Sequence, residues 1–579
     1  MKGKNITADE LCSRIDVAAG NAKADVALKN ARIVNVFTEK IEEADIAILG
    51  DTIAGIGRYH GGIEIDLEGK YVCPGFLDGH IHLESSMVSP REFERAVLPH
   101  GTTAVVTAPH ESTNVAGSDG LRYILDATGD LTLDVYVMMP ACVPCTAIDE
   151  SGAVFEAKDI RPWYAQERIL GLAEMMNSIG VVNKDEDILQ KIVDVKNCGK
   201  LIDGHAPLLS GNALNAYAGA GVLSDHECSN AQEAIEKLSL GQWIMIREGT
   251  AAMNLEALIS LCEAPYYQRC MFVTDDRHPG DLIKKGHIDY IIRKAVRLGA
   301  DPVHAIKMAT WNPAQYFGLH DRGAVAPGYR ADLVILENLE EIRVCGVYKD
   351  GKPAFEAEKI ISKPRTDYPR VWDSFHMPEV SEADLAVRTN GSIERVIELI
   401  PGELLTRELL IPKIEEAGFP VGVDPAQDIL KAVVFERHKN TGHRGIGFIK
   451  GYGIQKGAVA SSVAHDSHNL IVIGASDRDI MLAANCVRKN GGGLAVVIDG
   501  KVAGELPLPI AGLMSELSAE ETEEQLENLK KLCRDIGLAE GIDPFMTLGF
   551  VSLPVIPQLR LTTRGIVDVG KQEVLEAFF

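Results

Sequence analysis

Two histidines separated by one residue stand near residue 80, at the end of the apolar segment FLDGHIHLE that spans residues 76–84. In a β-strand, side chains two positions apart point the same way. A strand through this segment would therefore place Phe76, Asp78, His80, His82 and Glu84 on one face. Two imidazoles on a rigid strand can hold a metal ion. The segment thus favours a metal-dependent hydrolase over a pair of surface histidines.

Later apolar runs also end in residues that bind metals. Six residues in all suit two divalent ions that share a carboxylate and a hydroxide: His80, His82, Glu174, His205, His226 and Asp275. We expect Glu174 to be the shared carboxylate. Asp275 is the candidate to take a proton from metal-activated water and pass it to a leaving group. Histidine and carboxylate ligands accept Mn²⁺, Fe²⁺ or Zn²⁺, and the residues alone do not choose among these ions.

These residues need a scaffold that brings strand ends together, and the chain offers eight apolar runs separated by helix-like stretches. The runs are 76–82, 102–107, 133–139, 169–174, 200–205, 222–226, 243–247 and 271–275. Such alternation predicts a (β/α)8 TIM barrel over residues 74–320, with the ligands at the carboxyl ends of its strands. Short strands before and after it predict a small flanking β-sandwich built from residues 1–73 and 321–365.

A Pro-containing linker from Pro364 to Arg370 precedes a second region of mixed strand and helix patterns. In it, residues 429–435, 469–473 and 493–498 read as strands, and residues 477–490 and 520–536 read as helices. We therefore expect a C-terminal α/β domain over residues 371–579.

Composition excludes several classes of function. The chain has 579 residues with 58 Lys and Arg against 83 Asp and Glu, a net charge of -25 that disfavours binding to nucleic acid polymers. Its 11 cysteines show no disulfide framework, which is typical of a reducing compartment. We find no apolar leader and no apolar run long enough to span a membrane. These features predict a cytoplasmic protein that neither binds nucleic acid polymers nor spans a membrane.

Several longer stretches resemble the microbial adenine deaminases of the amidohydrolase superfamily. They are PGFLDGHIHLESSMVSP (74–90), GLAEMMN (171–177), DGHAPLLSG (203–211), GVLSDHE (221–227), TDDRHPGDLIKKGHIDYIIRKA (274–295), FERHKNTG (435–442) and VAHDSHNL (463–470). The resemblance covers nearly the whole chain, including a C-terminal domain that simpler amidohydrolases lack.

The resemblance implies hydrolysis of adenine to hypoxanthine and ammonia through attack of a metal-bridging hydroxide on purine C6. It implies two divalent ions per subunit, with Mn²⁺ favoured over Fe²⁺ or Zn²⁺. A homodimer or larger homo-oligomer is expected because acidic barrels of this size often associate. Asp275, Glu111 and His110 are the implied catalytic residues. Asp276 and Glu84 are the implied contacts to the substrate, although Asp276 would point away from Asp275 unless the backbone bends.

One residue departs from the expected family pattern, because Ala108 stands where we expect an Asp before Pro109-His110-Glu111. If that Asp orients His110 or a ligand, activity or metal occupancy would be lower here. His465 and His468 of the C-terminal region either cap a turn or help to close the barrel mouth over a small ligand. Two alternatives stay open: an amidohydrolase acting on another nucleobase or cyclic amidine or amide, and a metal-binding barrel with little catalytic activity.

Overall fold

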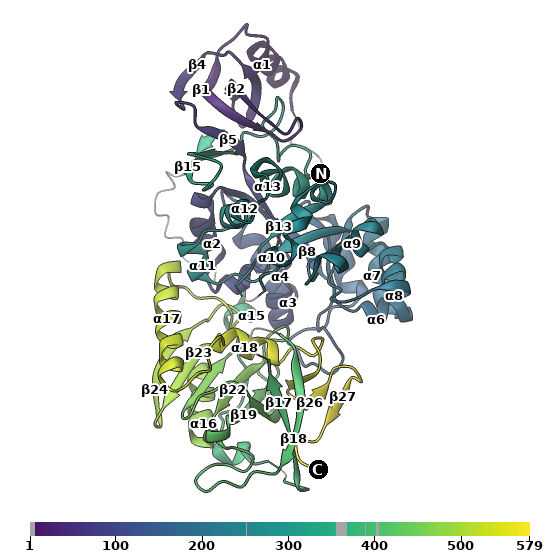
Figure 1. The fold of residues 1–579 in the computed structure, drawn as a ribbon, viewed down its shortest axis with the longest axis vertical. Coiled ribbons are helices and arrows are strands. Elements are labelled where there is room, and N and C mark those ends of the chain that lie inside the picture. The colour runs from purple at the N-terminus through teal and green to yellow at the C-terminus, as the bar shows by residue number, and fades with distance from the viewer. Residues whose placement is uncertain (1–5, 251, 355–366, 388, 401–403) are drawn as a thin grey trace.

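The structure is a computed structural model that describes residues 6–250, 252–354, 367–387, 389–400 and 404–579. It is elongated, with a β-sheet at one end, the barrel strands and their helices in the middle, and a second large sheet at the other end (Figure 1). The predicted linker from Pro364 begins among residues outside the described ranges. The described part of the chain contains no helix that is both long and apolar enough to cross a membrane.

Strands from both flanks of the barrel form one sheet. Its order is β16-β15-β14-β5-β1-β2-β3, and β4 also pairs with β1. The strands are β1 (Ala24–Asn35), β2 (Lys40–Leu49), β3 (Thr52–Gly57), β4 (Gly61–Asp66), β5 (Tyr71–Pro74), β14 (Leu333–Leu336), β15 (Val344–Lys349) and β16 (Lys352–Pro353). The two flanks meet where Leu333 of β14 pairs antiparallel with Pro74 of β5. The unit predicted as a sandwich is therefore a single eight-stranded sheet, with helix α1 (Ala8–Ala18) beside it.

All eight predicted barrel strands are present and pair in parallel. They are β6 (Phe76–Ile81), β7 (Thr102–Thr107), β8 (Asp134–Pro140), β9 (Ile169–Met175), β10 (Leu201–Gly204), β11 (Ser224–Asp225), β12 (Trp243–Arg247) and β13 (Cys270–Val273). They form a five-stranded sheet, β6 to β10, and a three-stranded sheet, β11 to β13. Backbone hydrogen bonds join the two sheets at both seams, from Leu223 N to the Ile202 carbonyl at 2.9 Å and from Asp275 N to the His80 carbonyl at 2.9 Å. The strands thus follow one another around a ring.

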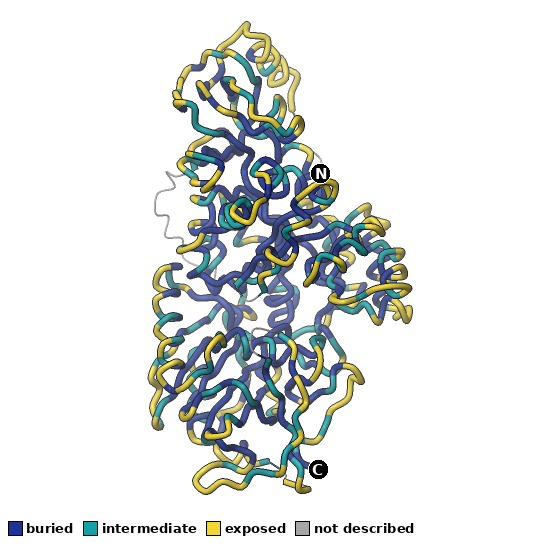
Figure 2. Tube along the Cα trace, in the orientation of Figure 1, coloured by how far each residue is buried: buried dark blue, intermediate teal, exposed yellow. Residues whose placement is uncertain are grey.

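Helices separate these strands along the chain or follow the last of them, as expected for β/α units. They are α2 (Pro90–Val97), α3 (His110–Ala116), α4 (Ser118–Ala127), α5 (Ala157–Ile160), α6 (Ser178–Asn183), α7 (Glu186–Asn197), α8 (Gly211–Ala220), α9 (Ala231–Ser239), α10 (Leu255–Leu258), α11 (Pro279–Lys284), α12 (Ile288–Arg297), α13 (Pro302–Met308) and α14 (Trp311–Tyr316). Nearly every residue of the strands is buried (Figure 2), because a parallel sheet covered by helices exposes neither face.

The C-terminal region is built on an eight-stranded sheet with the order β18-β17-β20-β19-β22-β21-β23-β24. Its strands are β17 (Ile393–Leu399), β18 (Thr406–Pro412), β19 (Ile429–Phe435), β20 (Arg444–Lys450), β21 (Ala458–Ser461), β22 (Leu470–Gly474), β23 (Gly493–Ile498) and β24 (Lys501–Pro507). A smaller sheet holds β25 (Leu559–Thr562), β26 (Gly565–Asp568) and β27 (Glu573–Leu575). The helices are α15 (Pro369–Trp372), α16 (Asp477–Lys489), α17 (Ala519–Asp535) and α18 (Pro544–Val551).

This region lies against the mouth of the barrel. The Ser515 N–H donates to the Met87 carbonyl at 2.8 Å, and the Asn469 side-chain amide donates to the Glu150 carbonyl at 2.7 Å. Lys284 of α11 pairs with Glu523 of α17 at 2.6 Å. The barrel mouth, where the predicted ligands stand, is therefore covered by residues of the C-terminal region.

Candidate metal centre and active site

The six predicted metal ligands meet at the barrel mouth, and Glu174 lies at their centre. Its Oε1 is 3.1 Å from His82 Nε2 and 3.4 Å from His80 Nε2. Its Oε2 is 2.9 Å from His205 Nδ1 and 3.1 Å from His226 Nε2. One carboxylate on β9 thus faces imidazoles from the ends of β6, β10 and β11, as expected for a group shared between two halves of a site.

Asp275 joins the cluster through a bend in the backbone after β13. Its Oδ1 is 3.1 Å from His82 Nε2 and 3.5 Å from His80 Nε2. The residue has a φ of 60°, in the left-handed region that side-chain-bearing residues seldom adopt and that often marks functional sites. The Arg247 guanidinium donates to Asp275 Oδ2 at 2.8 Å and also pairs with Glu227. Arg247 therefore fixes a proposed ligand.

The cluster suits a divalent cation for two reasons: its side chains are imidazoles and carboxylates, and some of their buried polar atoms have no hydrogen-bond partner among the described residues. His80 Nε2 and Glu174 Oε1 are buried and have no hydrogen-bond partner among the described residues. Burial alone would lower the pKa of His80, but the charges of Glu174 and Asp275 raise that pKa to about 10. The carboxylates therefore favour positive charge at this point, and buried charges of this kind are normally paired or coordinated to a metal.

His110 and Glu111, predicted to be catalytic, begin helix α3 beside the cluster. Glu111 Oε1 is 3.3 Å from His82 Nδ1 and 3.4 Å from His110 Nε2, and neither carboxylate oxygen has a hydrogen-bond partner among the described residues. Burial would raise the pKa of Glu111, but His110 and His82 lower it well below its usual value. Glu111 is thus an ionised carboxylate paired with His82 and His110 at the edge of the cluster.

Glu84 lies near the site, but the predicted reason for its position was wrong. Strand β6 ends at Ile81, and Glu84 belongs to a 3₁₀ turn, Leu83–Ser86, so no strand face relates it to the two histidines. Glu84 Oε1 instead accepts a hydrogen bond from the Ser112 N–H at 3.2 Å. Burial and the nearby Glu111 raise the pKa of Glu84 to about 7.

The backbone bends at Asp275, as the predicted contact of Asp276 with the substrate required. Asp275 is the residue with positive φ, and the following Asp276 accepts a hydrogen bond from the Ser85 hydroxyl of the turn after β6. Burial and the charge of Asp275 raise the pKa of Asp276. The two aspartates therefore serve different parts of one site, since Asp275 faces the histidines and Asp276 faces Ser85.

Ala108 contributes to the site through its main chain. Its carbonyl accepts a hydrogen bond from His82 Nδ1 at 3.0 Å, which orients the imidazole so that Nε2 faces Glu174. Its side chain is buried in a cluster with Leu77, Val106 and Met138. Any residue at position 108 supplies that carbonyl, so the expected loss of ligand orientation does not follow for His82.

The loop between β21 and β22 brings C-terminal residues into the site. His465 Nδ1 is 3.8 Å from Glu111 Oε1, and Asp466 Oδ1 is 3.8 Å from His110 Nε2. His465, Asp466 and His468 are all buried. This placement favours closure of the barrel mouth for His465, whereas His468 caps the turn, since its Nδ1 accepts a hydrogen bond from the Ala464 N–H at 3.1 Å.

Sequence reasoning missed several residues of the site. Glu227 pairs with Arg247, Asp466 lies beside His110, and Ser85 binds Asp276. Each directly follows a residue that the sequence singled out, namely His226, His465 and Glu84 in turn, and that adjacency was the one signal available.

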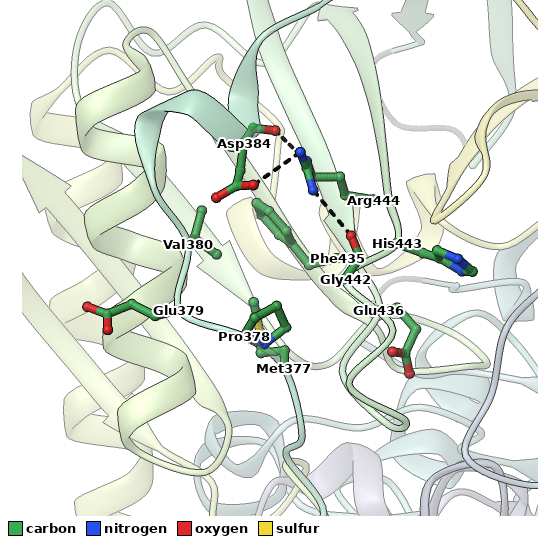
Figure 3. A pocket seen from close by; sticks show the side chains of 10 residues that line it. All are labelled: Met377, Pro378, Glu379, Val380, Asp384, Phe435, Glu436, Gly442, His443 and Arg444. Atoms are coloured by element: carbon green, nitrogen blue, oxygen red, sulfur yellow. Dashed lines mark hydrogen bonds and ion pairs between the residues drawn. The ribbon is translucent and has the colours of Figure 1, made fainter.

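A pocket in the C-terminal region stands apart from these groups. It is lined by Met377, Pro378, Glu379, Val380, Asp384, Phe435, Glu436, Gly442, His443 and Arg444. Figure 3 shows Arg444 paired with Asp384 there, and none of the predicted site residues lines it. The pocket therefore has no part in the metal centre.

A ring of parallel strands with these candidate metal ligands at its mouth is typical of the amidohydrolase class of metal-dependent hydrolases, and residues 71–357 match the model described as "Amidohydrolase family". This family implies a divalent metal ion. Residues 403–573 match "Adenine deaminase C-terminal domain".

Relatives match along almost the whole chain. "Adenine deaminase 2" of Carboxydothermus hydrogenoformans is 47% identical over 97% of this chain and 98% of its own. "Adenine deaminase" of Desulfatibacillum aliphaticivorans is 45% identical over 96% and 97%, and that of Clostridium acetobutylicum is 43% identical over 96% and 98%. The chain belongs to the adenine deaminase family, which confirms the predicted resemblance.

Proposed function

We propose that this protein hydrolyses adenine to hypoxanthine and ammonia. The observation that carries the proposal is the convergence of four imidazoles on Glu174, with Asp275 beside them, in a chain whose relatives are named adenine deaminases over nearly their whole length. Retention of all six predicted ligands argues against the rival function of a metal-binding barrel without turnover, because a descendant that had lost activity would more often have lost ligands.

We propose two divalent ions per chain, with Mn²⁺ first and Fe²⁺ or Zn²⁺ as alternatives. His80, His82 and Asp275 would hold one ion, His205 and His226 the other, and Glu174 both. When bound, such ions lower the pKa of water and so provide a nucleophile at neutral pH. Two observations support this division: the ligand atoms of His80, His82 and Asp275 lie within 4.8 Å of one another, and Glu174 Oε2 lies 2.9 Å from His205 Nδ1 and 3.1 Å from His226 Nε2.

The chain's own residues would then move protons and orient the purine. Asp275 would accept a proton from water and deliver it to the departing amino group, while Arg247 holds its second oxygen. Glu111, with His110 beside it, would exchange a proton with a ring nitrogen, a role supported by its two oxygens without a hydrogen-bond partner among the described residues. Asp276 and Glu84 would contact the purine from the turn side. The domain limits, the homo-oligomer and the cytoplasmic location remain predictions.

Ammonia release from adenine tests the proposal. The protein is stripped of metal, reloaded separately with Mn²⁺, Fe²⁺ and Zn²⁺, and assayed with adenine, guanine, cytosine and adenosine. We expect metal-dependent ammonia and hypoxanthine from adenine, with about two ions bound per chain. Turnover of a different base would identify that base, and not adenine, as the substrate. Metal uptake without turnover of any base would refute the proposed enzymatic activity.

A further inference from the structure

A buried aspartate lies at the seam between strands β10 and β11, which belong to different sheets of the barrel. Asp225 is the last residue of β11 and is fully buried. Proposed metal ligands stand just beyond both strands, His205 after β10 and His226 after β11. This seam is therefore where the two histidines of one half of the proposed centre come together.

The Asp225 carboxylate binds the main chain beyond both strands. Its Oδ1 accepts a hydrogen bond from the Ala206 N–H at 2.8 Å, and its Oδ2 accepts one from the Glu227 N–H at 3.1 Å. These N–H groups belong to the peptide units that directly follow His205 and His226. A buried N–H beyond the end of a strand needs an acceptor other than the neighbouring strand, and one carboxylate supplies it for both.

A buried lysine holds this carboxylate in place. Lys237 of α9 is fully buried, and its Nζ is 3.0 Å from Asp225 Oδ2, 2.8 Å from the Ala206 carbonyl oxygen and 2.7 Å from Glu233 Oε1. A buried carboxylate is tolerated when it is both paired and hydrogen-bonded. Lys237 therefore neutralises Asp225 and also binds the main chain after His205.

Tyr217 of α8 holds the main chain of His205 from its other side. The Tyr217 hydroxyl accepts a hydrogen bond from the His205 N–H at 3.1 Å and donates one to the Met175 carbonyl at 2.6 Å. Met175 directly follows the shared carboxylate Glu174. The peptide units on both sides of His205 are thus tied to the segments that carry the other ligands of this half.

We propose that Asp225 is a positioning residue for the half of the metal centre formed by His205, His226 and Glu174. It sets the spacing of the two imidazoles by binding the peptide group next to each of them. The assignment rests on the proposed function, which places a metal ion there, and deepens it by naming the group that fixes the ligands.

The other half of the centre stands at the opposite seam of the barrel. There the Asp275 N–H donates directly to the His80 carbonyl at 2.9 Å, so these two ligands are joined by their own backbone. Loss of the Asp225 carboxylate should therefore weaken the binding of one ion and spare the other.

A purely electrostatic role is the rival explanation, because a negative charge beside metal ligands also attracts a cation. The two explanations differ in their expectation for Lys237→Met. An electrostatic role predicts tighter or unchanged Mn²⁺ binding, since the substitution removes a positive charge. A positioning role predicts weaker binding, because the carboxylate and the Ala206 carbonyl lose the group that holds them.

Mn²⁺ titration of metal-free protein, with bound metal read by elemental analysis, tests the assignment. Asp225→Asn keeps the size of the side chain but leaves one acceptor oxygen in place of two, so one of the two peptide N–H groups loses its bond. The matched control is Asp332→Asn. Asp332 is also a buried aspartate paired with a buried lysine, Lys349, which contacts Asp134 at the start of β8, away from the barrel mouth. Melting temperatures of the metal-free proteins report folding.

We expect Asp225→Asn to raise the Kd of one Mn²⁺ ion about 10- to 100-fold, the range for a group that supports a metal ligand, and that of the other less than about threefold. Asp332→Asn should bind both ions as the wild type does. Two backgrounds identify the affected ion. Asp225→Asn should weaken the ion that remains in His80→Ala and leave the ion that remains in His226→Ala nearly unchanged, since its contact there is already lost.

Equal weakening of both ions, or unchanged affinity for both, in folded Asp225→Asn protein would overturn the assignment. So would tighter or unchanged Mn²⁺ binding by Lys237→Met, and this measurement decides alone if Asp225→Asn does not fold. A wild type that binds no second ion would instead refute the proposed metal centre, so the two failures are distinguishable.

Discussion

Glu174→Gln should disable the metal centre while preserving its shape. The substitution keeps the size of the side chain but removes its negative charge and replaces one oxygen with an amide that donates hydrogen bonds. In the structure, the Glu174 carboxylate lies 2.9–3.4 Å from nitrogens of His80, His82, His205 and His226. Both halves of the proposed centre would therefore lose a ligand at once.

The expected loss follows from this shared position. Residues that only support a metal ligand usually contribute 10- to 100-fold to affinity, so a carboxylate shared by both halves should contribute at least about 100-fold, or about 2.7 kcal/mol. Mn²⁺ titration of metal-free protein, read by elemental analysis and by adenine deamination, measures it. The control is Glu186→Gln, at an exposed position in the first turn of α7. Mn²⁺ affinity in Glu174→Gln equal to that of the wild type would refute the bridging role.

Three further predictions concern stability and the metal. Lys237→Met should lower the free energy of unfolding, measured in urea, by about 3–5 kcal/mol. The fully buried Lys237 Nζ is 3.0 Å from Asp225, and the substitution would leave that buried carboxylate without its cationic partner. A loss below about 1 kcal/mol would contradict this. Burial raises the pKa of Glu394 from 4.5 to about 7. The folded state therefore binds more protons than the unfolded state between these pH values, so stability should fall, by up to roughly 3 kcal/mol, as pH rises from 4.5 to 7. Glu394→Gln should flatten that dependence in thermal unfolding at pH 5 and pH 8, whereas an unaltered pH dependence would count against the buried acid. Chelation should lower both the melting temperature and the activity, and Mn²⁺ should restore them, because a metal bound only to the folded state stabilises it; a melting temperature insensitive to chelator would argue against a resident ion.

Local patterns in the sequence predicted the scaffold and the residues that meet in the candidate metal centre. Apolar runs bounded by polar residues located all eight barrel strands, and β19 has the predicted bounds, Ile429–Phe435. Parallel strands in a ring expose their carboxyl ends at one mouth. For that reason, ligand types at the ends of separate runs were enough to predict that Glu174 and the four histidines would meet.

Tertiary structure decided the contacts that have no local signature. Ser85 and Asp276 bind across 191 residues, and His465 approaches Glu111 from another part of the fold. Glu84 left the predicted strand face because the chain turns into a 3₁₀ helix after β6. Periodicity reports which face of one element is buried, but not which distant element covers it. The covering of the barrel mouth by the C-terminal region could therefore be found only in the folded chain.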